Sequence, residues 1–199
     1  MAGKGLSSEV IYQAALELMV EKGYDCFSLR ELASRLDVKP ASLYSHIKNV
    51  DEISTAVGMA AITKMSDTLN QAIAGKNRED AVYRFAYAYR DFALQNSELY
   101  RAIIGIPASD DATLARKEQE TIAPLRAVVG RFVEQEKNLV NFQRYLRSAI
   151  HGFIMLESVG FMRCSDVSTN ESFDMLVQTC LEALIQASMR ESYEKKAEK

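Results

Sequence analysis

Residues 28–47, with the sequence SLRELASRLDVKPASLYSHI, are the segment that most restricts how this chain can fold. Apolar residues recur there at helical spacing before and after Asp37, which predicts two short amphipathic helices joined by a tight turn. Pro40 fits the first position of the second helix, and Leu43 and Ile47, four residues apart, are expected to face inward. Its small and polar residues then face outward, which suits the major groove of DNA better than a protein core.

Signals for helix ends surround this segment. A helix is predicted over residues 8–22, where apolar residues recur along one face. Residues 28–31, Ser-Leu-Arg-Glu, form a capping box, and residues 49–52, Asn-Val-Asp-Glu, repeat the same logic. The second of these boxes opens a predicted connector helix over about residues 49–74. Asp37 is expected at the turn because Asp tolerates a positive φ better than most residues.

The rest of the chain lacks the alternation that is typical of strands and predicts further helices. One is expected over residues 141–163, and another carries an apolar stripe over residues 173–189. The charged tail, residues 191–199, is expected to fray. The predicted fold is therefore all-α with about nine helices. It comprises a three-helix helix-turn-helix head in residues 1–50 and a helical bundle for ligand binding and dimerisation in residues 51–199.

Overall charge gives no support for nucleic-acid binding, because 24 basic residues face 27 acidic ones and the net charge is −3. The distribution of charge is more informative than the total. Residues 30–48 hold four basic residues against two acidic ones, which is enough for a local basic rim that contacts phosphates. The basic residues are Arg30, Arg35, Lys39 and Lys48, and the acidic residues are Glu31 and Asp37.

No run of 18 apolar residues occurs and the first residues lack an apolar stretch, so neither a membrane span nor a signal peptide is expected. Three cysteines without Cys-x-x-Cys spacing predict reduced thiols in a cytoplasmic protein. A redox sensor made of Cys164 and Cys180 is the alternative, although no feature of the sequence would lower the pKa of either thiol. No metal-ligand spacing, phosphate loop or nucleophile–base motif is present, so we predict no metal, cofactor or catalytic residue.

The outward residues of the second short helix carry chemistry that recognises DNA. Ala41 can contact a thymine methyl group, and Ser42 can hydrogen-bond a base or a phosphate. The Tyr44 hydroxyl, the His46 ring and Lys48 can donate to phosphates, which set register without carrying sequence information. The predicted DNA-binding residues are Arg30, Lys39, Pro40, Ala41, Ser42, Tyr44, Ser45, His46 and Lys48.

Residues 8–55 resemble the DNA-binding head of TetR-family transcriptional regulators. The resemblance is carried by Gly-Tyr at 23–24 and by Leu-Tyr-Ser-His-Ile at 43–47. Because the family's usual lysine after this motif is absent, Lys48 is expected to supply that phosphate contact. The departures from the family pattern are Asp37 for the turn glycine, Lys39 for a serine or threonine, and Val50 for the lysine.

The body also resembles part of that family. Residues 149–153, Ala-Ile-His-Gly-Phe, followed by Glu157 and Gly160, are similar to a subtype with a tryptophan-histidine-glycine signature, although this chain has no tryptophan. The resemblance implies a homodimer that binds double-stranded DNA at a palindromic operator and usually represses transcription. It also implies that a small molecule bound in the body shifts the spacing of the two heads and releases the DNA.

Aromatic and small residues of the body are candidates for ligand binding and dimerisation. Core packing is an equal alternative for each aromatic residue, and His151 also fits a buried core histidine. A pocket of this kind would hold a small apolar or aromatic effector. The predicted pocket residues are Phe85, Tyr89, Phe92, Tyr100, His151 and Met155. The predicted interface residues, which would build a four-helix bundle between two subunits, are Tyr145, Gly152, Phe173, Leu176, Val177, Cys180 and Leu184.

Other functions stay open at this point. The two short helices could be a hairpin within a bundle, or a helical protein-interaction module that does not bind DNA. An enzyme built on a helical bundle would show turnover that depends on His151 or Glu157. Binding to duplex DNA that weakens with added salt would favour the regulator over both alternatives.

Overall fold

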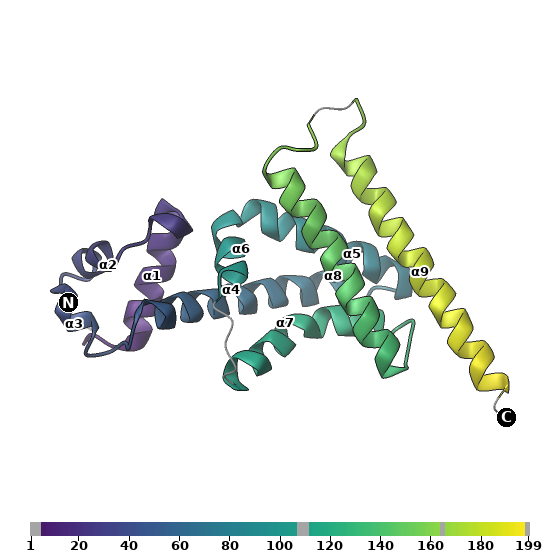
Figure 1. Cartoon of the computed structure of the whole chain (residues 1–199), viewed down its shortest axis with the longest axis horizontal. Helices are drawn as coiled ribbons and strands as arrows, with labels where there is room; N and C mark the ends of the chain where they lie inside the picture. Colours follow the sequence, from purple (N-terminus) through teal and green to yellow (C-terminus); the bar gives the residue numbers. More distant parts are fainter. Residues whose placement is uncertain (1–4, 107–111, 164–165, 198–199) are drawn as a thin grey trace. The chain divides into compact units, whose positions relative to one another are not determined.

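The computed structural model describes residues 5–106, 112–163 and 166–197, which form nine α-helices, one short 3-10 helix and no β-strand (Figure 1). The all-α prediction is confirmed. No helix in these ranges combines the length and the apolar content that crossing a membrane requires. The helices are α1 (Ser8–Lys22), η1 (Tyr24–Cys26), α2 (Leu29–Arg35), α3 (Pro40–Leu43), α4 (Val50–Ile73), α5 (Arg78–Gln95), α6 (Ser97–Ile104), α7 (Ala112–Val129), α8 (Glu136–Ser158) and α9 (Thr169–Ala197).

The chain divides into two compact units. The first contains residues 1–64 and 96–117, and the second contains residues 65–95 and 118–199. The first unit therefore includes α6, which the sequence analysis assigned to the body. The reason is packing, because Ala102 of α6 is buried in the same apolar cluster as α1, α2 and the start of α4. The helix-turn-helix is thus one part of a larger unit.

The core of the first unit holds its short helices in place. Leu32 of α2, Leu43 of α3 and Ile53 of α4 are fully buried in it. Burial of each such side chain contributes about 1.5–3 kcal/mol. Gly58 allows α4 and α6 to approach closely, since a Cβ at that position would lie 2.9 Å from the carbonyl oxygen of Ala102. Tertiary packing of this kind stabilises α2 and α3, which are too short to be stable alone.

In the second unit, α5, α8 and α9 pack against one another around a core that contains a charged network. The guanidinium of Arg90 donates to both carboxylate oxygens of Glu157, with 2.7 Å between Nε and Oε2. It also donates to Oδ1 of Asn170 at 2.9 Å and lies 4.8 Å from the ring centroid of Phe173. These contacts join α5, α8 and α9 through one buried side chain.

The end of α9 differs from the prediction. The tail was expected to fray from residue 191, but α9 continues to Ala197. Glu191 is buried, and its carboxylate accepts hydrogen bonds from the backbone N–H of Glu134 at 2.8 Å and from Asn138 Nδ2 at 2.6 Å. Lys195 adds an ion pair with Glu134. The prediction of a frayed tail was wrong because α9 caps the segment before α8.

The bounds of α8 also differ, since it was expected over residues 141–163 and spans Glu136–Ser158. Its start lies beside the capping contacts of α9. Its end is set by Gly160, which adopts φ 81°. The N–H of Phe161 donates to the carbonyl of Leu156 there, which is the closing bond of a glycine-terminated helix.

Candidate nucleic-acid interface

The start of α2 and the turn that follows it have the predicted geometry. The Ser28 hydroxyl accepts the N–H of Glu31 at 3.3 Å and donates to the Glu31 carboxylate at 3.0 Å, as a capping box requires. Asp37 adopts φ 54°, the left-handed region in which glycine is usual. The N–H of Val38 donates a hydrogen bond to the carbonyl of Ala33 at 3.0 Å. The turn that links α2 to α3 is therefore closed by backbone bonds despite the lack of glycine.

The second helix of the motif, α3, is shorter than the sequence indicates. It begins at Pro40 and ends at Leu43. Lys39 has extended backbone and provides no side-chain cap, which agrees with the absence of the family's serine or threonine. The N–H groups of His46 and Ile47 donate to the carbonyl of Leu43, so the chain continues as turns up to the next helix.

Contacts from α1 and α4 fix the position of this segment. The Ser8 hydroxyl donates to the carbonyl of His46 at 2.7 Å. The Glu52 carboxylate accepts the Tyr12 hydroxyl at 2.6 Å and the backbone N–H of Lys48 at 2.7 Å. These two bonds lower the pKa of Glu52. Desolvation, together with the hydrogen bond to Glu52, raises the pKa of Tyr12 to about 12. The C-terminal end of the probe segment, residues 39–48, is thus tied to α1 and α4.

The start of α4 is capped by the chain itself. Oδ1 of Asn49 accepts the N–H of Glu52 at 2.9 Å, as the sequence pattern predicts. Because Glu52 in turn occupies the N–H of Lys48, neither of these backbone donors is left for a phosphate. The ammonium group of Lys48, which is exposed, remains the donor at this point.

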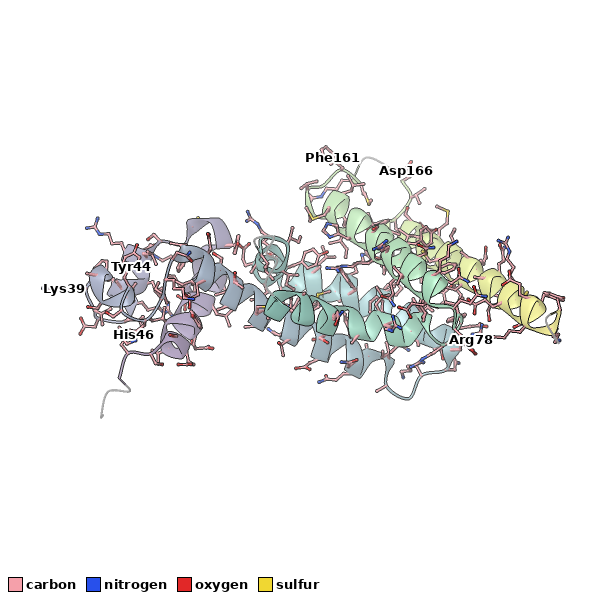
Figure 2. The ribbon with its side chains drawn as sticks, turned by 60° about the horizontal axis from the view of Figure 1, so that its bottom comes forward. Lys39, Tyr44, His46, Arg78, Phe161 and Asp166 are labelled. Carbon is pink, nitrogen blue, oxygen red and sulfur yellow. The ribbon has the colours of Figure 1, made fainter. Side chains whose placement is uncertain are left out.

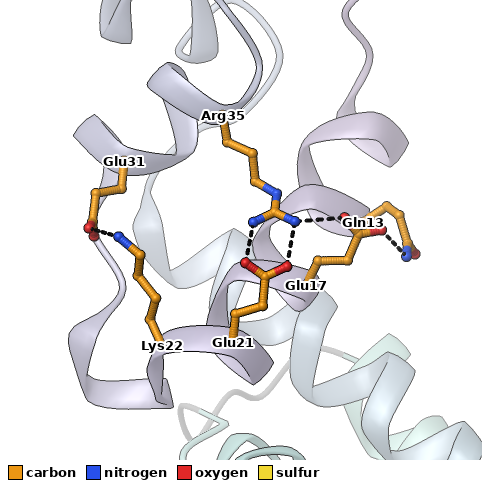
Figure 3. Close-up of polar contacts among 6 residues, drawn as sticks. All are labelled: Gln13, Glu17, Glu21, Lys22, Glu31 and Arg35. Carbon is orange, nitrogen blue, oxygen red and sulfur yellow. Dashed lines mark hydrogen bonds and ion pairs between the residues drawn. The ribbon is translucent and has the colours of Figure 1, made fainter.

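Arg35 does not belong to the basic rim that the sequence predicts. Its guanidinium donates to both carboxylate oxygens of Glu21 on α1, at 2.6 and 2.7 Å, and to Glu17 at 3.4 Å (Figure 3). These contacts raise the pKa of Arg35, with the Glu21 hydrogen bond as the main cause. Lys22 and Glu31 form a second ion pair between α1 and α2 (Figure 3). The cations on this side are neutralised within the protein.

Eight of the nine predicted DNA-binding residues lie within residues 39–48, in and around α3. Lys39, Tyr44 and His46 are exposed at the α3 end of the first unit (Figure 2), and 56% of Tyr44 is accessible. The Ser45 hydroxyl donates to the carbonyl of Ser42 at 3.0 Å, so it is engaged by its own turn. Within the described part of the chain, no ion pair is formed by the three remaining cations of the motif. They are Arg30, Lys39 and Lys48.

Comparison with known proteins agrees with this geometry. Residues 11–57 match the family model described as bacterial regulatory proteins, tetR family, and residues 82–180 match a tetracycline repressor-like C-terminal domain. An HTH-type transcriptional regulator of Mycobacterium tuberculosis, Rv0681, is 31% identical over 86% of this chain and 78% of its own length. The chain belongs to the TetR family. It is a DNA-binding transcriptional regulator.

Other relatives of this TetR-family regulator cover nearly its whole length. The HTH-type transcriptional regulator YobS of Bacillus subtilis is 28% identical over 91% of this chain and 94% of its own length. Apo ActR from Streptomyces coelicolor has a TM-score of 0.69 at 17% identity, with 95% of this chain and 99% of that chain covered. The TetR-family regulator PfmR from Thermus thermophilus has a TM-score of 0.57 at 20% identity over 86% of this chain and 97% of that chain. These two structures share the fold.

The predicted pocket residues of this TetR-family chain are distributed over both units. Phe85, Tyr89 and Phe92 are buried on α5 in the second unit, whereas Tyr100 is buried on α6 in the first unit. Met155 is exposed on α8. His151 is partly buried, and desolvation followed by the charge of Arg147 lowers its pKa, which favours the neutral ring. Their role in ligand binding stays a prediction.

The predicted interface residues fall into two classes. Four of them are buried within a single chain, where Phe173 packs against the rings of Tyr87 and Phe153. Their burial is therefore already explained by contacts within one protomer. The buried residues are Phe173, Val177, Cys180 and Leu184, and the residues with accessible surface are Tyr145, Gly152 and Leu176.

The cysteines give no support to a redox pair. Cys180 is buried, and desolvation raises the pKa of its thiol, which disfavours the reactive thiolate. Cys164, the proposed partner of Cys180, lies outside the described residues. Cys26 is exposed and free.

A cavity of about 600 Å³ lies in the second unit and was not predicted from the sequence. Its volume falls in the range of small-molecule sites. On α8 its residues recur three or four positions apart on one face, a pattern that could have signalled a shared surface. It is lined by Gln119, Ala123, Leu125 and Arg126 of α7 and by Glu136, Val140, Gln143, Arg144 and Arg147 of α8.

Proposed function

We propose that this TetR-family regulator is a cytoplasmic repressor that binds a palindromic operator as a homodimer and is released by a small apolar or aromatic effector. The observation that carries the proposal is the division of charge within the head. Cations on the α1 side of α2 are paired with carboxylates, whereas Lys39 and Lys48 beside α3 are exposed and form no ion pair with a described residue. Unpaired cations beside an anchored α3 favour phosphate contacts on both sides of a base-reading helix.

The accessible residues of the probe segment, residues 39–48, divide into two expected roles. Tyr44, Lys39 and Lys48 donate to phosphates, which fixes the register of the head on the duplex. Ala41 and Ser42 face the base edges from the start of the helix and carry sequence preference. Arg30, Pro40, Ser45 and His46 complete the proposed DNA-binding surface.

An exposed stripe on α8 supports the homodimer. Tyr145, Gly152, Leu156 and Val159 recur at helical spacing, and the last two are 48% and 61% accessible. Apart from the backbone of α8 itself, no described atom lies within 4 Å of a Cβ built on Gly152, so a helix of a second subunit has room to approach there. Leu176 of α9 is partly buried and extends the proposed interface, which would form a four-helix bundle between two copies.

The proposal predicts a defined effect on DNA binding. A Tyr44→Ala, Lys48→Ala double variant should bind a selected operator at least tenfold more weakly, while Ala41 and Ser42 variants should alter sequence preference. Fluorescence anisotropy with operator DNA selected from genomic fragments measures both effects. An Arg84→Met, Lys137→Met double variant, which removes two exposed cations of the second unit, is the matched control and should bind as the parent does.

Equal affinity of the parent and the Tyr44→Ala, Lys48→Ala variant would contradict the proposed contacts. The absence of any binding to duplex DNA would instead favour the helical protein-interaction module. Sedimentation analysis of the parent should give a dimer, and a Gly152→Arg variant should shift the species toward the monomer.

A further inference from the structure

The cavity between α7 and α8 combines an apolar wall with a row of nitrogen donors. Ala123 and Leu125 of α7 and Val140 of α8 supply the apolar part. Gln143, one turn of α8 beyond Val140, lines the same space. The same face of α8 continues to Arg147, so the cavity is lined by both apolar and polar side chains.

Gln143 carries an unsatisfied donor. Its side-chain nitrogen Nε2 is buried and has no hydrogen-bond partner among the residues that the structure describes, and the residue is only 9% exposed. Buried amide nitrogens in folded proteins nearly always have a partner, so an exception indicates a function or a missing acceptor. The group that is needed here is an oxygen atom that accepts a hydrogen bond.

The charges around the cavity favour an anion. Arg126 is neutralised by Glu136, with hydrogen bonds of 2.9 and 2.6 Å across the rim. Arg144 and Arg147 line the same cavity and form no ion pair with a described residue. Two guanidinium groups that form no ion pair with a described residue, beside an amide donor without a described partner, suit a carboxylate or sulfonate, which arginine binds with well-directed hydrogen bonds.

We propose that this cavity binds a small organic anion with an apolar body. Its carboxylate or sulfonate contacts Gln143, Arg144 and Arg147, and its hydrocarbon part lies against the apolar wall. The inference deepens the proposed function, on which it rests for any effect on DNA, because it names the chemical class of the effector. Binding itself does not depend on that function.

Three probes test the proposal on the full-length protein. The first is 8-anilinonaphthalene-1-sulfonate, an aromatic sulfonate whose fluorescence rises in apolar sites, and the others are decanoate and decan-1-ol as competitors. We expect saturable fluorescence that decanoate displaces at least tenfold more effectively than decan-1-ol. The two competitors share a chain length and differ in the head group, so their ratio reports the contribution of the anion.

Variants locate the binding site. Arg144→Met with Arg147→Met should weaken decanoate binding at least tenfold, whereas Arg84→Met with Arg190→Met, which removes two exposed arginines of the same unit outside the cavity, should leave it within twofold. Gln143→Leu removes the amide donor at similar volume and should also weaken decanoate. It provides a test that does not alter charge.

Three results would overturn the inference: equal displacement by decanoate and decan-1-ol, equal loss in the control variant, or no saturable binding of either anion. Operator binding is measured separately by anisotropy without any probe. If the parent binds operator but no anion, the inference fails alone. If it binds the anions through Arg144 and Arg147 but no DNA, the proposed function fails and the site stands.

Discussion

In the first compact unit every buried side chain that the structure describes is apolar, whereas the second unit buries Arg90, Gln143 and Glu191. The ion pairs of the first unit lie at its surface, where Arg35 and Lys22 meet carboxylates of neighbouring helices. Exposed pairs of this kind contribute little to stability. The first unit therefore depends on apolar packing, and Arg30, Lys39 and Lys48 form no ion pair with a described residue.

The polar groups of the second unit are satisfied to different degrees. Arg90 and Glu191 each have several partners, but Nε2 of Gln143 has none among the described residues. Satisfied buried polar groups fix a unique packing, whereas an unsatisfied one costs about 1–3 kcal/mol. The two units are therefore stabilised in different ways. The unsatisfied amide of Gln143 lies in the cavity that we propose binds an anion.

The largest effect is expected from the buried ion pair of the second unit. Glu157→Gln removes the charge that compensates Arg90, and we expect a loss of about 3–5 kcal/mol in the free energy of unfolding. Urea denaturation measures it. The double variant Arg90→Met, Glu157→Met should recover most of the loss, because it removes both charges. A double variant as unstable as the single one would contradict this account, because the loss would then not come from the uncompensated charge of Arg90.

The second largest effect is expected at Glu191, whose ionisation makes the stability of the second unit depend on pH. Burial acts to raise its pKa, but hydrogen bonds from Glu134, Asn138 and Gln135 outweigh burial and lower it below the ordinary value of 4.5. The stabilisation is therefore present above about pH 4.5 and is lost as pH falls through the folded-state pKa. Glu191→Gln should cost about 1.5–3 kcal/mol at pH 7 and flatten the acid side of the stability profile. An unchanged profile in the variant would contradict this account.

The networks around Arg90 and Glu191 could not be predicted from the sequence. Local signals located the start of α1, the capping box at Ser28, the turn at Asp37 and the first residue of α3, because each depends on a few neighbouring residues. The start of α8 could not be found in this way, since it depends on Glu191, more than fifty residues away. Its end could have been found, because Gly160 is a local stop signal.

The candidate site shows the same division. Exposure of Lys39, Tyr44 and Lys48 follows from the helical pattern. The pairing of Arg35 with Glu21 was not predicted, because it depends on how α1 and α2 cross. The cavity between α7 and α8 was not predicted either, since its volume depends on the packing of two helices and not on either pattern alone.

A substitution at Gln143 is expected to have a smaller effect, and to stabilise the protein. Gln143→Leu replaces the unsatisfied amide with an apolar group of similar size, so the free energy of unfolding should increase by about 1 kcal/mol. A rise of about 2–4 °C in the melting temperature is expected for a chain of this size. Calorimetry of the protein without ligand measures it. A less stable variant would mean that the amide already has a partner.

The smallest expected effect is in the head. Tyr12→Phe deletes one hydrogen bond to Glu52 and should cost about 0.5–1.5 kcal/mol. In the parent, the raised pKa of Tyr12 means that this contact is complete below pH 10 and is lost as pH rises through about 12. Urea denaturation at pH 7 measures the cost. A loss above about 3 kcal/mol would place more of the head's stability in polar contacts than the apolar core allows.

The central claim is that unpaired cations beside α3, and not the paired cation of α2, contact DNA. The direct measurement is the salt dependence of operator affinity for Lys39→Met, Lys48→Met and Arg35→Met variants. Because the proposed homodimer carries two copies of each lysine, each lysine variant should reduce the slope of log K against log salt by about 2, while Arg35→Met leaves the slope unchanged. A slope reduced by Arg35→Met and untouched by both lysine variants would contradict the account.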